Sequence, residues 1–308
     1  MDDKSKLSIE PYKGVRDFYP EDMAIQNYIF DTWRKVAESL NYVEYGSSIL
    51  EPAELYRSKS GEELVNEQMF TFTDRGDREV ALRPEMTPTL ARMVAAKRKS
   101  LKFPLRWFSM PNLFRYERPQ RGRKREHWQL NCDVMGIADL SADVEIISLA
   151  YKIMKAFGAE DHDFQICIND RVLLNEKFGN PELIKLLDRK EKMEADEFNQ
   201  KWLEVSGKEF DSNITPNETI TELLKQLEDV GIKNAVFNPT ITRGFDYYTE
   251  MVFEVFDTHP DNNRSLFGGG RYDNLLEIFG VEPVPTVGFG MGDITMRDFL
   301  ETHGLPLS

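Results

Sequence analysis

Hydrophobic and polar residues alternate along this chain in patterns that predict long helices leading into short strands. Apolar residues recur every three or four positions from 23 to 40, and Pro20 followed by two acidic residues is typical of a helix start. Segments 68–73 and 79–82 alternate with a period of two on either side of an Asp-Arg-Gly-Asp turn, which predicts a hairpin. Pro84 then precedes a second helical pattern.

The rest of the chain continues these two patterns, apart from one segment of different composition. Further strands are predicted at 42–50, 106–110, 235–237, 252–256 and 286–292, and further helices at 142–157 and 293–300. Between 170 and 233 leucines recur at helical intervals among many charged residues, and strand signals nearly vanish. The sequence therefore predicts an α+β protein with a helical insertion at 170–233.

A β-hairpin with one polar face and a basic tip is predicted by the stretch that begins NLFRYERPQ and ends QLNCDVMG. Arg115 and Glu117 lie two residues apart, so in an extended strand both side chains face the same way. Gln129, Asn131 and Asp133 alternate with apolar residues on the returning strand. The tip between the strands carries Arg118, Arg121, Arg123, Lys124 and Arg125. Charged loops are usually no more than solvated surface, but an arginine, carboxylates and an amide on the strands favour a ligand site whose tip can bend over an anion.

Polar residues also gather where other predicted elements meet. Glu85 and Thr87 lie at a strand-to-helix junction, a favoured place for ligand-binding groups, although helix capping alone would also explain them. Arg243, Tyr247 and Tyr248 stand immediately before the predicted strand at 252–256, where they serve either a ligand or packing.

Two glycine-rich stretches mark the C-terminal part of the chain. Three consecutive glycines precede Arg271 and Tyr272, but neither P-loop nor GxGxxG spacing is present, so neither nucleotide-binding fingerprint matches. Gly288, Gly290 and Gly292 occupy every second position. On a strand these glycines clear one face and leave room for a flat ligand.

Composition narrows the class of protein. The 308 residues allow one large domain or two modest ones, and a net charge of −14 argues against binding nucleic acid over a broad surface. The two cysteines have no metal-ligand spacing and predict no disulfide framework. No apolar signal core or membrane-spanning stretch is present, so we expect a cytoplasmic enzyme or binding protein without membrane association.

The motifs together resemble a known family. FRYERPQRGR with REHWQLNCDVMG resembles the class II aminoacyl-tRNA synthetases, and RGFDYYT and GGGRYD resemble two signature stretches of the histidyl-tRNA synthetases. The likeness runs from about residue 13 to 300. It implies a six-stranded antiparallel sheet flanked by helices, and a homodimer formed through the first helix and strand. It also implies that L-histidine is activated with ATP, accompanied by Mg²⁺, and is then transferred to the 3′ end of tRNA(His).

The resemblance assigns roles at the ATP end of the site. Arg115 would hold the α-phosphate, Glu117 would meet the adenine amino group, and Arg123 would fold over the pyrophosphate. His127 stands where the family places an aromatic ring that stacks on adenine. Arg243 would lie against the α-phosphate where related enzymes place a metal, so Arg115 and Arg243 would be catalytic and the only metal would arrive with ATP.

The resemblance also assigns the histidine pocket. Its residues would be Glu85, Thr87, Gln129, Asp133, Arg243, Tyr247, Tyr248 and Tyr272. The carboxylates would receive the substrate's ammonium group, and tyrosines would contact its imidazole. A polar pocket of this kind rejects analogues that leave its buried groups unpaired.

The sequence departs from the family pattern in ways that keep a second function open. Thr295 stands where the family usually has an arginine for the γ-phosphate, and Arg297 lies roughly 200° further round a helix. The family's C-terminal anticodon-binding domain is absent from these residues, as it is from the histidine-binding regulatory subunits of ATP phosphoribosyltransferase, which are paralogues of this core. A histidine sensor has no need of Arg115, Glu117, Arg123 and Arg243 together, and this set favours the enzyme.

Overall fold

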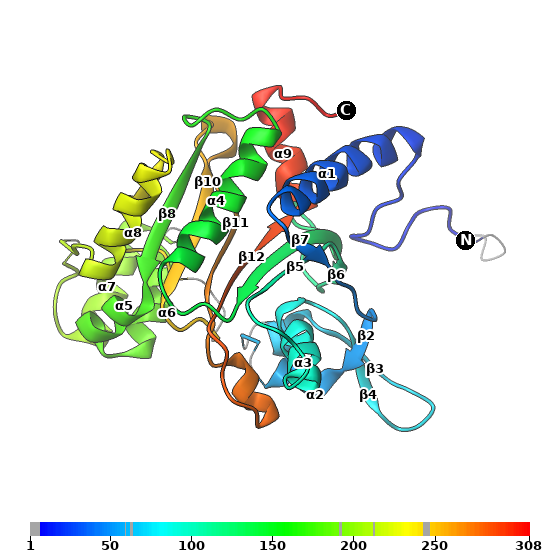
Figure 1. The fold of residues 1–308 in the computed structure, drawn as a ribbon, viewed down its shortest axis with the longest axis horizontal. Helices are drawn as coiled ribbons and strands as arrows, with labels where there is room; N and C mark the ends of the chain where they lie inside the picture. The colour runs from blue at the N-terminus through cyan, green and yellow to red at the C-terminus, as the bar shows by residue number, and fades with distance from the viewer. Residues whose placement is uncertain (1–6, 59, 62–63, 191–192, 212, 243–246) are drawn as a thin grey trace, which may run out of the picture.

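A large β-sheet runs through the middle of the molecule, in a computed structural model that describes residues 7–308 apart from 59, 62–63, 191–192, 212 and 243–246 (Figure 1). Its strands are β1 (Val43–Glu44), β5 (Leu105–Ser109), β6 (Asn112–Phe114), β7 (Glu126–Met135), β8 (Phe164–Asp170), β9 (Ala235–Phe237), β10 (Met251–Asp257), β11 (Ser265–Arg271) and β12 (Thr286–Gly292). Among the described residues the order is β1-β5-β7-β12-β11-β10-β8-β9, and β6 pairs with β7 beside this path. The six strands from β5 to β8 are antiparallel to their neighbours, and β1 and β9 add in parallel at the edges. The expected antiparallel sheet flanked by helices is confirmed.

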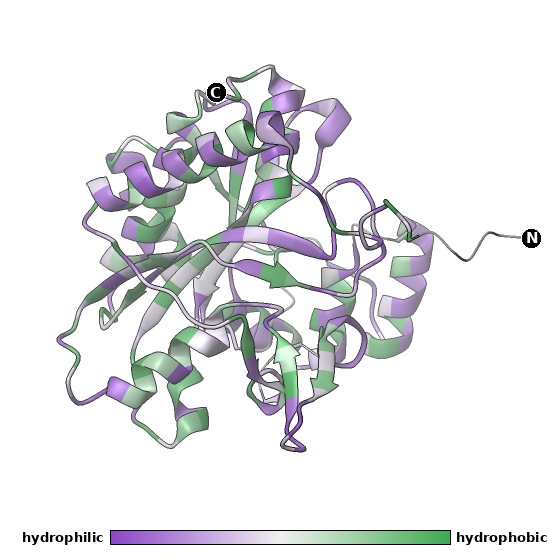
Figure 2. Cartoon of the chain, turned by 90° about the vertical axis from the view of Figure 1, so that its right-hand side faces the viewer, coloured by the Kyte–Doolittle hydropathy of each residue, from purple (hydrophilic) through white to green (hydrophobic). Residues whose placement is uncertain are grey.

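Helices cover one face of this sheet. They are α1 (Pro20–Ser39), α4 (Ser141–Ala156), α8 (Glu218–Asp229) and α9 (Asp293–His303). Their apolar sides, represented by the fully buried Trp33 and Ile146, pack on strand residues such as Phe253 in the main hydrophobic core. Hydrophobic and hydrophilic colours alternate along the helices in Figure 2, as expected for helices with one face against a sheet.

The opposite face of the sheet is only partly covered. A second, three-stranded sheet lies on this side, formed by β2 (Leu50–Pro52), β4 (Glu79–Leu82) and β3 (Phe70–Thr73), together with the helices α2 (Ala53–Arg57) and α3 (Thr87–Lys97) (Figure 1). Buried residues of α3, including Leu90 and Val94, pack near Val252 of β10 and Leu276. The uncovered remainder of this face carries the polar residues singled out in the sequence.

The segment at 170–233 contains helices α5 (Arg171–Phe178), α6 (Pro181–Asp188), α7 (Ala195–Ser206) and α8 at one end of the sheet (Figure 1). Asp170 caps α5 by accepting a hydrogen bond from the backbone of Val172. Leu174, Phe198 and Trp202 form a small hydrophobic core separate from that of the sheet. No described helix is both long and apolar enough to cross a membrane.

Two strand predictions were incomplete. The predicted strand at 42–50 is two short strands, since β1 pairs with β5 in the large sheet and β2 pairs with β4 in the small one. Arg83 holds the segment that connects β1 to β2, because its guanidinium donates a hydrogen bond to the backbone oxygen of Ser47 at 3.0 Å. The strand β8 was not predicted, because its polar last two residues, Asn169 and Asp170, resemble the start of the charged segment that follows.

Candidate functional site

A hollow on the uncovered face of the sheet brings together most of the predicted site residues. It lies over β7, β11 and β12, between α3 and the residues before β10. The predicted residues that line it are Glu85, Thr87, Arg115, Gln129, Asp133, Tyr247, Tyr248 and Tyr272. The structure adds Asn131 to this group, a residue whose alternation on the hairpin had already placed it on the polar face.

Glycines of β12 make room for this hollow. Gly288 is the cross-strand partner of Asp133, and a Cβ at Gly288 would overlap the Asp133 carboxylate. A Cβ at Gly290 would stand 2.6 Å from Nε2 of Gln129. The space over these glycines is therefore occupied in part by side chains of β7, which extend over β12. The rest of the space is left for a ligand.

Asp133 is a buried carboxylate with few hydrogen bonds to stabilise its negative charge. The hydroxyl of Tyr272 donates to Oδ1, while Oδ2 is buried and has no hydrogen-bond partner among the described residues. Burial raises the pKa of Asp133 to about 7, against the opposing effect of the Tyr272 hydrogen bond. A carboxylate of this kind is suited to a ligand that brings a positive charge.

Glu85 is the second buried carboxylate of the hollow. Ser60 donates to one of its oxygens, and the Tyr247 hydroxyl donates to the other at 3.2 Å. Burial raises the pKa of Glu85, while the Ser60 hydrogen bond, the charge of Arg115 and the Tyr247 hydrogen bond lower it. Sequence reasoning missed Ser60, because the segment around it shows no periodic pattern.

Three tyrosines form one wall of the hollow. The rings of Tyr247 and Tyr248 have centroids 4.9 Å apart, and Tyr247 meets Tyr272 edge-on at 5.6 Å. Each ring presents an apolar surface and carries a hydroxyl that donates or accepts a hydrogen bond. The wall can therefore enclose a flat, polar ring such as an imidazole.

The residues predicted to hold the nucleotide lie between the end of β6 and the start of β7, and of these Arg115 lines the hollow. β6 ends at Phe114, and the backbone N–H of Glu117 donates to the oxygen of Arg115 at 2.7 Å, so the prediction of an extended strand through both residues is wrong. Arg115 instead donates from Nε to the backbone oxygen of Pro84 at 2.9 Å. Arg123 lies 3.7 Å from the Glu117 carboxylate, so these two predicted ATP ligands form an ion pair with each other.

His127 lies on β7 opposite Leu113. Burial, together with the positive charges of Arg115 and Arg16, lowers the pKa of His127 to about 3. The imidazole is therefore neutral at physiological pH and can offer an uncharged aromatic face to a base.

Arg243, the other predicted catalytic residue, lies outside the described residues. Among the residues that are described, no group of histidine, cysteine, aspartate and glutamate side chains is arranged to hold a metal ion.

Arg271 of the GGGRYD motif points away from the hollow. Its guanidinium donates to both oxygens of Asp143 on α4 and to the backbone oxygens of Ile137 and Asp139. Burial raises the pKa of Asp143 to about 6 even though Arg271 opposes this shift. The buried pair joins the end of β11, directly before Tyr272, to the segment that follows β7, and so helps fix the two sides of the hollow.

Thr295 and Arg297 of α9 both have partners within the protein. The hydroxyl of Thr295 donates to the backbone oxygen of Leu266 at 2.8 Å, and Arg297 pairs with Asp22 and Glu301. Neither residue lines the hollow, so neither stands in for the family's arginine there.

The irregular segment before α1 is bound near the start of β7 and of α9. Arg16 donates to the buried Asp293 at 2.7 Å, and Asp293 also accepts from the backbone N–H of Trp128 at 2.9 Å. The backbone N–H of Arg125 donates to the oxygen of Gly14 at 2.7 Å. The lead-in segment therefore contacts the residue before β7 and the first residue of α9, and its Phe18 meets Trp128 of β7 edge-on at 5.4 Å.

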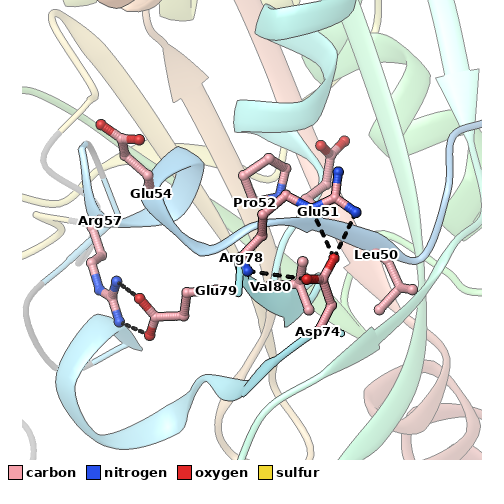
Figure 3. Close-up of a pocket in the computed structure, with 9 residues that line it drawn as sticks. All are labelled: Leu50, Glu51, Pro52, Glu54, Arg57, Asp74, Arg78, Glu79 and Val80. Carbon is pink, nitrogen blue, oxygen red and sulfur yellow. Dashed lines mark hydrogen bonds and ion pairs between the residues drawn. The ribbon is translucent and has the colours of Figure 1, made fainter. Parts of the chain in front are cut away.

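A second hollow, of about 610 Å³, lies beside the small sheet (Figure 3). Its charged groups are already paired in part, since Arg57 binds Glu79 and Arg78 binds Asp74. It contains none of the predicted site residues, so we assign the candidate site to the hollow over β7, β11 and β12.

Comparison with known proteins gives consistent results. The family model for histidyl-tRNA synthetase matches residues 14–202 and 173–293. A histidine–tRNA ligase of Leptospira biflexa is 45% identical over 98% of this chain and 76% of its own length. The histidyl-tRNA synthetase structure from Nostoc sp. PCC 7120 has a TM-score of 0.80 at 21% identity, covering 98% of this chain and 78% of that one. A structure from Bacillus halodurans described as an ATP phosphoribosyltransferase regulatory subunit/histidyl-tRNA synthetase has a TM-score of 0.79 at 24% identity, covering 96% and 83%.

Proposed function

This chain belongs to the histidyl-tRNA synthetase family, and we propose that it is a histidine–tRNA ligase. It activates L-histidine with ATP to form histidyl-adenylate and pyrophosphate, and then transfers histidine to the 3′ end of tRNA(His). The observation that carries this proposal is the pair of buried carboxylates, Glu85 and Asp133, beside three tyrosines on one face of the sheet.

The histidine end of the pocket follows from this chemistry. The carboxylates receive the ammonium group, because each is buried and neither has a cation in hydrogen-bond contact among the described residues. Tyr248 and Tyr272 contact the imidazole, while Thr87, Gln129 and Tyr247 complete the pocket. A substrate without a polar ring would form no hydrogen bond with these tyrosine hydroxyls and would bind more weakly.

The reaction needs two anions, the substrate carboxylate and the α-phosphate, to be held together. Arg115 and Arg243 supply the positive charge, and their planar guanidinium groups suit bidentate contacts with both anions. They also stabilise the charge that builds on phosphorus in the transition state. No metal-binding side chain is required in this scheme, since Mg²⁺ arrives bound to ATP.

Glu117, Arg123 and His127 bind the rest of the nucleotide. His127 stacks its neutral ring on adenine, and Glu117 accepts from the adenine amino group. This contact requires Glu117 to exchange its pairing with Arg123, which frees Arg123 to turn toward the pyrophosphate. ATP would thus replace one ion pair with two ligand contacts.

At the level of the whole chain, residues 1–308 form the catalytic core, and the helical insertion at 170–233 leans toward the acceptor end of the tRNA. The enzyme acts in the cytoplasm as a homodimer. The dimer contact uses α1 and the neighbouring short strands, where Tyr19, Val43 and Leu50 are exposed apolar side chains.

Histidine-dependent exchange of pyrophosphate into ATP tests the proposal. Wild-type protein should exchange only with histidine present, and Arg115→Ala or Arg243→Ala should lower the rate by at least roughly 100-fold, because each removes charge from the transition state. Arg78→Ala, at an exposed arginine outside the site, is the matched control and should leave the rate unchanged. Charging of tRNA(His) is then measured with the same proteins.

The opposite result would favour the regulatory function. Histidine binding without any exchange would contradict the ligase and support a histidine-binding regulatory subunit of ATP phosphoribosyltransferase. That activity appears in the description of one structural neighbour at 24% identity, whereas the 45% identical relative is a ligase.

A further inference from the structure

A cation outside the predicted site residues lies against the basic tip (residues 118–125). Arg264 stands directly before β11, and its Nη1 donates to the backbone oxygen of Arg121 at 3.1 Å. Gly122 makes this approach possible, because its φ is +76° and a Cβ there would overlap the Arg264 guanidinium. The tip that was predicted to bend over an anion therefore contacts a guanidinium from another part of the sheet.

The Arg264 guanidinium has hydrogen-bonding capacity to spare. Nη2 donates to Asp298 of α9, while Nε is buried and has no partner among the described residues. Asp298 also faces Arg121 at 3.9 Å, and Arg123 pairs with Glu117. These three arginines face only two carboxylates, and the excess positive charge suits a polyphosphate.

Arg264 also supplies the positive charge on one face of α9. Thr295 and Asp298 are three residues apart and therefore lie on the same side of the helix. The Thr295 hydroxyl is used by the backbone of Leu266, so it offers no donor to an anion. The cations on this face come from outside α9: Arg264, which stands directly before β11 and is held by Asp298, and Arg121 of the basic tip.

We infer that Arg264 binds the phosphates of ATP beyond the α-phosphate, opposite the cations of the basic tip. This inference rests on the proposed function, since it adds a residue to the ATP site of the same reaction. Arg264 meets the β- and γ-phosphates through its free Nε and its Nη groups, and Asp298 keeps the side chain in place before ATP arrives.

Binding of ATP and of AMP, measured by calorimetry on wild type and Arg264→Gln, tests the inference. The Kd for ATP should rise roughly 10- to 100-fold, because charge-assisted hydrogen bonds to phosphate are lost. The Kd for AMP should not change, because AMP lacks the phosphates that Arg264 contacts. In pyrophosphate exchange, the KM for ATP should rise while the KM for histidine stays the same.

Arg297→Gln is the matched control, since Arg297 lies on α9, is similarly exposed and also pairs with carboxylates. It should leave both nucleotide affinities unchanged. An equal loss of ATP and AMP binding in Arg264→Gln would show a merely structural role, and unchanged ATP binding would also overturn the inference. If Arg264→Gln does not fold, Arg264→Lys replaces it, with a smaller loss expected for ATP alone. Wild-type protein without histidine-dependent exchange would contradict the proposed function instead.

Discussion

Asp133 shows how a single residue can be prepared for a ligand at the expense of stability. Its carboxyl is buried against Tyr272, and its pKa is raised from 3.8 to about 7. The folded, ligand-free protein therefore holds a proton that the unfolded chain releases near pH 4. The free energy of unfolding should fall as the pH rises through this interval, because ionising the buried carboxyl is costly.

Histidine binding should offset the free-energy cost of ionising the buried Asp133 carboxyl. If the ammonium group pairs with ionised Asp133, affinity should fall about tenfold for each unit of pH below 7, and binding at pH 6 should release a proton. Calorimetry in buffers of different ionisation enthalpy measures both effects. Because free histidine also titrates in this range, Asp133→Asn is measured at the same pH values.

Asp133→Asn should bind histidine more weakly at pH 8 and lose the part of the pH dependence that comes from the carboxyl. It should also raise the free energy of unfolding at pH 8, by on the order of 1–3 kcal/mol. Identical pH profiles for the two proteins would contradict this account of the residue.

Single residues of the site were predicted from the sequence only where they belong to a motif or to a period-two pattern. Asp133 and the tyrosines could be named in this way and Glu85 from its place at a strand-to-helix junction, and the structure brings them together. Ser60 and Arg264 belong to no such pattern. Their positions depend on contacts between distant segments, which a local reading of the sequence does not contain.

Among the elements, β12 supports the site without contributing a reactive side chain. Its backbone pairs with β7 on one side and β11 on the other, and its glycines give space to side chains from β7. The strand therefore requires glycine at positions such as Gly288, where a Cβ would overlap a side chain of β7, and can accept a larger residue elsewhere.

Gly288→Ala should abolish measurable histidine binding, because its methyl group would occupy the space of the Asp133 carboxylate. We also expect a loss of roughly 1–3 kcal/mol in the free energy of unfolding from overpacking. Gly292→Ala is the matched control on the same strand, since its nearest neighbour would be the Thr295 hydroxyl at 3.5 Å. Denaturant unfolding and calorimetry measure the two effects. Equal behaviour of the two variants would show that the close approach at Gly288 is not critical.

Most elements could be predicted from periodicity, and the exceptions share a physical cause. The helix at the start of the chain and the strand rich in glycines follow their local patterns. The separation of β1 from β2 does not, because both are too short for a pattern and each is stabilised by pairing with a distant strand. β6 likewise ends at Phe114, where the chain makes a tight turn between Arg115 and Glu117 and the backbone N–H of Tyr116 donates to the oxygen of the distant Gln68 at 2.7 Å.

At the scale of the whole molecule, the proposed homodimer can be tested through its exposed apolar side chains. Leu50 is 44% exposed on β2, and we expect Leu50→Glu to weaken association, because burying an unpaired charge in an interface is costly. Sedimentation should give a species of about twice 35.8 kDa for wild type and a lighter one for the variant. Val230→Glu, at a valine that is 58% exposed beyond α8, should remain dimeric. A wild-type monomer at micromolar concentration would contradict the proposal.

The contact between Arg16 and Asp293 has a consequence for the order in which tertiary contacts form during synthesis. The two residues are 277 positions apart, so Arg16 leaves the ribosome long before its partner has been synthesised. At ordinary rates of translation this interval lasts on the order of tens of seconds. During that time Arg16 has no Asp293 carboxylate to bind. The contact between Arg16 and Asp293 would thus form only after the 276 residues between them have been synthesised, whereas the contact between Gly14 and Arg125 can form earlier.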